Sequence, residues 1–339
     1  MADMTDPRLI KSSMIPSEGN IDDFAVADVN GRPWAVCASR SDVWTWDLIG
    51  GEWLERPLGD FDNGSYGIPV YPDFEHIDVT VVDGRLLFAA GGQHQGPGLW
   101  DVMSGDLLNA PPEFRSCVHA LGMTSADGRI TLVAGAAAPE VWVWDPSDPE
   151  VEAWGPTDDE YAEEQESREL PGHSGDMSDL VVGRLRGRPV VVSGGDGEVL
   201  LSDLESEELV HKWSADGLVH AVALSEVDGR PVVLAVTDSG ELRSWDAVGG
   251  EPVGRFLTGH TERVSTLAAA VVGARTLAVT GSDDGTARVW DLAEGRQIGA
   301  PLAGHEGEIW AVAITLMDGR HVVLTAGRGG VVRVWDPAV

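Results

Sequence analysis

Short stretches of β-forming residues recur along the chain, each separated from the next by a turn that contains glycine. Near the C-terminus, WAVAITLM reaches the turn DGR, HVVLTA follows, and a glycine-rich turn leads into VVRVWD. Glycine in a short connection between two β-forming segments predicts a hairpin, because the tight turn needs positive φ. No helical periodicity accompanies this pattern. The chain is therefore predicted to be an all-β protein built from consecutive hairpins.

Two motifs repeat seven times. Six Trp-Asp pairs and one degraded copy, LLSD, end at Asp47, Asp101, Asp145, Asp203, Asp246, Asp291 and Asp336. A turn of the type NGR, DGR, RGR or GAR precedes each copy. The tryptophans, with Ser202 for the missing one, are about 54, 44, 58, 43, 45 and 45 residues apart, close to the period of four-stranded propeller blades. Residues 1–339 are thus predicted to form one domain, a single seven-bladed β-propeller of four-stranded antiparallel blades whose blades end near those seven aspartates.

These motifs resemble the WD-repeat β-propeller family over essentially the whole chain. Gly-His pairs stand at His173, His260 and His305, where the family places them before an inner strand. The resemblance implies a structural hydrogen-bonded set in blade six, formed by His260, Thr280, Asp284 and Trp290. Incomplete sets remain in blade seven (His305, Thr325 and Trp335, with Gly329 for the acid) and in blade four (His173 and Asp196, without the tryptophan). The first three blades lack the histidine and the acid, and we expect apolar packing to hold them.

The ends of the chain predict how the ring closes. Only three residues follow Asp336, too few for a fourth strand, while PRLIKSS near the N-terminus is similar to the fourth strands of other blades. We expect residues 8–13 to complete the last blade beside the strand that ends at Trp335. This closure protects two sheet edges that an open ring would expose.

Two insertions interrupt the repeat, at residues 59–74 and 155–175. We expect both to lie between one blade's outer strand and the next blade's inner strand, on the top face of the ring. We expect the turns after the Trp-Asp pairs on that face too, with the DGR turns on the opposite, bottom face. All three tyrosines (Tyr66, Tyr71 and Tyr161) fall in the insertions, and tyrosine suits interfaces. The acidic run at residues 157–169 has the composition of a solvated segment.

Alignment of the inner strands by their turn glycine gives two polar rows before a uniformly apolar one. The first row holds Asp22, Glu75, His119, Ser178, His220, Ser265 and Trp310; the second includes Asp23, His76 and Asp179. We expect these rows to ring the upper mouth of a central channel, the usual ligand site of a ring-shaped fold. The predicted ligand-binding residues are Asp22, Asp23, Glu75, His76, His119, Asp179, His220 and Trp310, with Tyr66 and Tyr71 overhanging. The competing interpretation is a channel mouth that is polar only because it is solvated.

Charge narrows the choice of partners. The net charge is −33, and only Lys11 and Lys212 are lysines. Such an acidic surface repels nucleic acid and anionic membranes, so a protein or peptide, possibly basic, is the better partner. No apolar run spans a membrane and no signal-peptide core is present, so a cytoplasmic location is expected. Cys37 and Cys117 fall in different blades and are expected to stay free thiols.

The leading functional hypothesis is a non-enzymatic scaffold that binds a protein or peptide on the top face. It rests partly on the family resemblance, since most WD-repeat proteins are scaffolds. The alternative is a small-molecule lyase, isomerase or cyclase with Glu75, His76, His119 and His220 as acid–base groups, because histidine near acids is easily tuned to neutral pH. No cofactor and no metal site is predicted, and no nucleophile elbow or phosphate loop points to a reaction.

Overall fold

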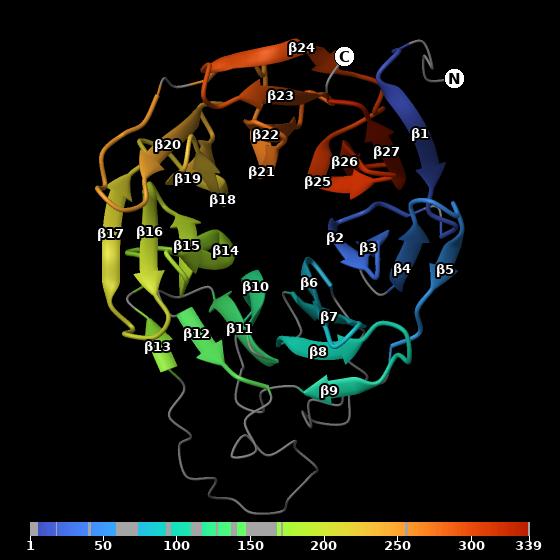
Figure 1. The fold of residues 1–339 in the computed structure, drawn as a ribbon, viewed down its shortest axis with the longest axis horizontal. Helices are drawn as coiled ribbons and strands as arrows, with labels where there is room; N and C mark the ends of the chain where they lie inside the picture. The colour runs from blue at the N-terminus through green and yellow to red at the C-terminus, as the bar shows by residue number, and fades with distance from the viewer. Residues whose placement is uncertain are drawn as a thin grey trace, which may run out of the picture.

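A computed structural model describes residues 6–17, 19–39, 42–58, 74–92, 96–109, 117–126, 128–136, 141–146, 168–170, 172–254 and 257–337. Seven antiparallel sheets stand around a ring, with their first strands nearest the centre and their last strands on the periphery (Figure 1). The fold is thus the predicted seven-bladed propeller. The described residues contain no helix of a length and apolarity that could cross a membrane.

The sheets follow the order of the chain, and the strands of each are given from the centre outward. Blade one is β2 (Asp23–Val29), β3 (Arg32–Ser39), β4 (Asp42–Asp47) and β5 (Trp53–Glu55); blade two is β6 (His76–Val82), β7 (Arg85–Gly91), β8 (Gly98–Asp101) and β9 (Leu107–Asn109). Blade three is β10 (Val118–Ala126), β11 (Arg129–Ala136), β12 (Val141–Trp144) and β13 (Arg168–Leu170). Blade four is β14 (Met177–Leu185), β15 (Arg188–Gly195), β16 (Glu198–Asp203) and β17 (Leu209–Ser214).

The last three blades complete the ring. Blade five is β18 (Val219–Val227), β19 (Arg230–Thr237) and β20 (Leu242–Asp246), and two isolated bridges, Leu242 to Leu257 and Trp245 to Pro252, stand where the other blades have a fourth strand. Blade six is β21 (Val264–Val272), β22 (Arg275–Ser282), β23 (Ala287–Asp291) and β24 (Arg296–Leu302). Blade seven is β25 (Ile309–Met317), β26 (Arg320–Gly327), β27 (Val331–Trp335) and β1 (Leu9–Met14).

The turns between first and second strands have the geometry that the sequence predicts. In the turn between β25 and β26, Asp318 and Gly319 have φ of 51° and 73°. Two successive positive φ values define the type I′ turn, whose twist matches that of the strands it joins. The DGR pattern therefore fixes a hairpin through backbone conformation.

The N-terminal strand closes the ring as predicted. β1 pairs antiparallel with β27, with Leu9 opposite Trp335 and Met14 opposite Val331. Its flanking side chains reach both neighbouring blades: the Arg8 guanidinium donates to the carbonyls of Ala300 and Pro301 in blade six, and the Lys11 ammonium donates to a carbonyl of blade one. Three blades are joined by this one strand, and the two termini lie close together (Figure 1).

One buried apolar cluster fills each seam between neighbouring blades, so the described residues contain seven clusters. The motif tryptophans Trp46, Trp100 and Trp335 are among the most buried side chains. Each fully buried large apolar side chain contributes about 1.5–3 kcal/mol. Cys37 is buried inside such a cluster, and no disulfide joins Cys37 to Cys117, as predicted.

The prediction that the Trp-Asp turns share a face with the connections between blades was wrong. The arginine of the DGR turn pairs with the motif aspartate of its own blade, as in Arg85 with Asp101 and Arg129 with Asp145, each at 2.7 Å. The first and third strands of an antiparallel meander run in the same direction, so both end on the bottom face. The top face carries the connections between blades and the turns between second and third strands.

The two insertions also differ from each other. Residues 59–73 join β5 to β6, so the first insertion connects two blades as predicted. Residues 147–167, in contrast, join β12 to β13, the third and fourth strands of one blade, so the prediction that this insertion follows the outer strand was wrong. Strand β12 ends on the bottom face. Tyr66, Tyr71 and Tyr161 lie outside the described residues.

Candidate functional site

A β-bulge shapes the start of five inner strands. In blade seven, Ile309 pairs with Gly327 and Ala311 with Ala326, which leaves Trp310 as the extra residue. The same irregularity leaves His119, Ser178, His220 and Ser265 as the extra residues of blades three to six. A bulge bends the strand and redirects the side chain of the inserted residue. The polar row predicted at the channel mouth is therefore, in these blades, a row of bulge residues, and its members are all half-buried.

The second row serves the seams instead. The Asp23 carboxylate accepts the backbone N–H of Phe24 at 2.8 Å and, across the seam, that of Ile77 in blade two at 3.0 Å. Asp179 likewise accepts the N–H of Val222 in blade five at 2.8 Å. Buried polar groups of this kind complete the hydrogen bonding of the neighbouring strand. Asp23 and Asp179 therefore connect adjacent blades.

A third carboxylate that bridges a seam, that of Asp78, was not predicted from the sequence. Asp78 accepts the N–H of Val79 at 2.8 Å and that of Met123 in blade three at 2.7 Å. It stands two positions further along its strand than Asp23 does, so an alignment by rows separates the two. Burial raises the pKa of Asp23 to about 8, of Asp179 to about 7 and of Asp78 to about 6, although their N–H partners oppose the rise.

The imidazoles of His76 and His119 lie near each other at the seam of blades two and three. Burial, and then the neighbouring His119, lower the pKa of His76 to about 4, so the ring is neutral at physiological pH. Glu75 precedes His76 at the top of the same strand and is half-buried, as is Asp22 in blade one. The structure thus places Asp22, Glu75, His76 and His119 at the top of three consecutive blades.

His220 belongs to a different sector. Burial lowers its pKa, with a further contribution from Arg263 of blade six, while Asp238 and Asp283 act in the opposite direction. Its Nε2 is buried and has no hydrogen-bond partner among the described residues. His220 and Trp310 come from blades five and seven, on either side of blade six, and neither is in the sector of His76 and His119. Within the described part of the chain no group of three metal-ligating side chains comes together.

Charge is distributed unevenly around the top rim. In blade six Arg263 pairs with Asp283 at 2.9 Å, and in blade seven the same two positions carry Glu308 and Arg328, which pair at 3.1 Å with the polarity reversed. In blade four the equivalent positions are Asp176 and Asp196, and in blade five Leu218 and Asp238. No ion pair joins these carboxylates to a cation among the described residues, so the rim of blades four and five carries unneutralised negative charge.

Blade six contains the complete structural set implied by the resemblance. The His260 imidazole contacts Asp284 at 3.0 Å through Nδ1 and Thr280 at 2.8 Å through Nε2, and the Trp290 indole donates to Thr280 at 2.9 Å. All four groups are engaged with one another, and the His260 side chain is 1% exposed. A histidine, a hydroxyl and an acid in this arrangement hold strands together and leave no nucleophile accessible to a substrate.

The incomplete sets behave as their missing members dictate. In blade seven His305 contacts Thr325 at 2.7 Å and Trp335 donates to Thr325 at 2.9 Å, but the His305 Nδ1 has no partner in the described chain. Burial lowers the pKa of His305 to about 3. In blade four His173 contacts Ser193 at 2.8 Å, and its Nδ1 is also without a described partner, so Asp196 does not complete this set.

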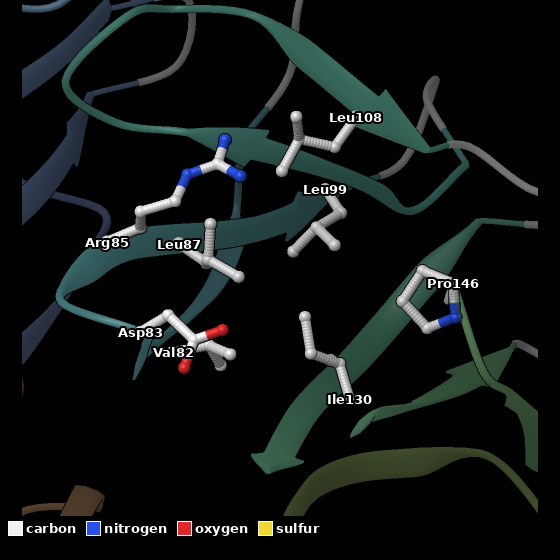
Figure 2. Close-up of a pocket in the computed structure, with 8 residues that line it drawn as sticks. All are labelled: Val82, Asp83, Arg85, Leu87, Leu99, Leu108, Ile130 and Pro146. Carbon is white, nitrogen blue, oxygen red and sulfur yellow. The ribbon is translucent and has the colours of Figure 1, made fainter. Parts of the chain in front are cut away.

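A hollow lies far from these sets, on the bottom face at the seam of blades two and three. Figure 2 shows apolar side chains from both blades pointing into a common space, with Asp83 and Arg85 at its edge. No sequence pattern had drawn attention to it.

Comparison with known families identifies two of the repeats. Residues 250–291 and 296–336 match the family described as WD domain, G-beta repeat. The match covers blades six and seven, which carry the two sets that retain both Thr and Trp. No curated protein shows significant similarity to the chain. Together with the seven-bladed fold, the two matched repeats support a WD-repeat propeller, a fold that generally mediates protein interactions.

Proposed function

We propose that this protein is a non-enzymatic scaffold that binds a protein or peptide at the top mouth of its ring. The observation that carries the proposal is the row of bulges: five blades present one residue in the same backbone geometry, and these residues are two histidines, two serines and a tryptophan. A constant frame with varied side chains is how a rigid fold supports recognition. The second-row carboxylates Asp23 and Asp179 are instead engaged in the seams.

Trp310 is the expected anchor of the bound segment. Its side chain is only half-buried, so part of the large apolar indole surface is exposed to water. Tryptophan is enriched among the residues that dominate binding energy in protein interfaces, because it buries a large rigid surface. A partner that covers this indole removes the remaining apolar surface from water.

The charge of the rim favours a basic partner. Asp176, Asp196 and Asp238 have no ion-pair partner among the described residues, and the whole chain has a net charge of −33. Complementary charge raises the rate of association and excludes acidic competitors. We therefore expect Lys or Arg residues of the partner near blades four and five, with an apolar residue near Trp310.

The test is affinity capture with matched variants of the full chain. We expect Trp310→Ala and His220→Ala to lose a partner that the wild type retains, while Arg320→Ala, on the bottom face, keeps it. Circular dichroism and the melting temperature check that all three variants are folded. Equal capture by all three variants would move the site away from the mouth.

A further inference from the structure

A cavity of about 160 Å³ opens at the bottom of the seam between blades two and three. Its apolar lining comes from Val82, Leu87, Leu99, Leu108, Ile130 and Pro146, which converge on one space in Figure 2. Leu87, Leu99 and Ile130 also belong to the buried cluster of this seam, so the cavity borders that cluster. A cavity of about 150 Å³ with an aliphatic lining holds one benzene-sized molecule, so this space has the size of a single apolar side chain.

The cavity lies beside Pro146, the residue that follows the motif aspartate of blade three. The residue after the motif aspartate packs into the seam with the preceding blade: it is Leu48 in blade one, Val102 in blade two, Leu204 in blade four, Ala247 in blade five and Leu292 in blade six. In blade three it is Pro146, and in blade seven it is Pro337, which is buried. At the seam of blades seven and one, Leu48 packs with Met317 and Val322, which are the equivalents of Val82 and Leu87. The space thus corresponds to the place that Leu48, Leu204 and Leu292 occupy in three other seams.

Pro146 also removes a hydrogen bond. In blades one, two, four, five and six, the N–H of this residue donates to the carbonyl of the residue after the turn arginine, as Leu48 does to Pro33 at 3.2 Å and Val102 to Leu86 at 3.0 Å. Proline has no N–H, so the Ile130 carbonyl lacks this donor. The equivalent carbonyls of the five other blades accept this N–H.

We propose that this cavity binds one leucine- or phenylalanine-sized side chain of a basic segment of a partner protein. The apolar part of the occupant follows from the residues that fill the equivalent space in other seams. The basic part follows from charge complementarity: Arg85 is already paired with Asp101 at 2.7 Å, whereas Asp83 is exposed and has no ion-pair partner among the described residues. This site lies on the bottom face and does not rest on the function proposed for the mouth.

Two substitutions at one position separate volume from hydrogen bonding. Pro146→Leu restores the leucine of the other seams and fills the cavity, whereas Pro146→Ala restores only the N–H. We expect P146L to melt about 2 °C or more above P146A, because filling a cavity stabilises a fold. Saturation-transfer NMR of the full chain with benzene is expected to show binding to the wild type and to P146A, and a loss of at least tenfold in P146L.

The charge is tested with two capped dipeptides, acetyl-Leu-Lys-amide and acetyl-Leu-Glu-amide. The wild type is expected to bind the first at least threefold more tightly, and Asp83→Asn to remove that preference while benzene binding is kept. Benzene binding that persists in P146L, no benzene binding to the wild type, or equal binding of the two dipeptides would each overturn the proposal. A dimer of the chain that benzene dissociates, seen by light scattering, would assign the cavity to a second copy and overturn it as well.

Discussion

Blade six and blade one pack the same tryptophan with different chemistry. In blade six the Trp290 indole donates to Thr280, which His260 and Asp284 hold in place. In blade one the position of Thr280 is taken by Cys37, and the buried Nε1 of Trp46 has no partner among the described residues. Trp46 instead stacks on Trp53 with ring centroids 5.2 Å apart, and the Lys11 ammonium lies 5.2 Å from its centroid.

This comparison indicates that the histidine and the hydroxyl occur together, as parts of one hydrogen-bonded set. The three blades with a Gly-His pair have Thr280, Thr325 or Ser193 at the hydroxyl position. The blades without the pair have Cys37, Ala90, Ala134 and Ala235 there. A buried hydroxyl without a partner costs more than an alanine. Where the histidine is absent, aromatic and aliphatic packing replaces the network as a whole.

The largest effect is expected from removing the strand that joins blade one to blade seven. Deletion of residues 1–14 takes away Lys11, exposes one edge of β27 and removes Leu9 from the apolar cluster between blades six and seven. We expect a loss on the order of 5 kcal/mol or more, a large part of the stability of a typical domain. Thermal unfolding checks the result, and an unchanged melting temperature would contradict the role of β1.

The next largest effect separates the two chemistries directly. Thr280→Val keeps the shape but leaves the Nε1 of Trp290 and the Nε2 of His260 without partners, for an expected loss of about 2–4 kcal/mol. Cys37→Val is the matched control at the equivalent position of blade one. It is expected to cost less than about 1.5 kcal/mol, because no hydrogen bond depends on the thiol. Urea unfolding compares the two variants, and equal losses would refute the distinction.

A smaller effect is expected from pH, through the seam carboxylates. The pKa of Asp23 is raised to about 8 by burial, so the folded state binds a proton that the unfolded state releases above about pH 4. Stability is then lost as the pH rises toward 8, and the protein is expected to be more stable at pH 6 than at pH 8. Asp23→Asn should reduce that difference by about half, since Asp179 shares it. Urea midpoints at the two pH values measure the effect; an unaltered difference in the variant would count against it.

The smallest effect concerns the cation over Trp46. Lys11→Met keeps the apolar stem but removes the charge above the ring and the bond to the Leu48 carbonyl. We expect a loss of about 1 kcal/mol. Lys212→Met, on the outer strand of blade four, serves as the control for removal of a lysine as such. A loss at Lys11 no larger than at Lys212 would show that the cation does not support blade one.

The sequence predicted what depends on spacing and turn chemistry. Six Trp-Asp pairs, one degraded copy and their glycine turns defined the blades, and the similarity of residues 8–13 to the fourth strands of other blades predicted closure by β1. It did not predict the position of the second insertion, because β13 is only three residues, Arg168–Leu170, and backbone pairing alone makes them a strand. Asp78 was missed because it occupies a different row from Asp23. The bulges at His220 and Trp310 were not predicted, because an extra residue in one strand is visible only when its pairing with the neighbouring strand is known.

We infer that the hydrogen-bonded sets stabilise the propeller, whereas the bulge residues bind the partner protein or peptide. Isothermal titration of the captured partner against Trp310→Ala and Thr280→Val, at a temperature where both are folded, tests it most directly. For Trp310→Ala we expect at least tenfold weaker binding and an unchanged melting temperature. For Thr280→Val we expect unchanged binding and a lowered melting temperature. Weakened binding in Thr280→Val together with intact binding in Trp310→Ala would contradict it.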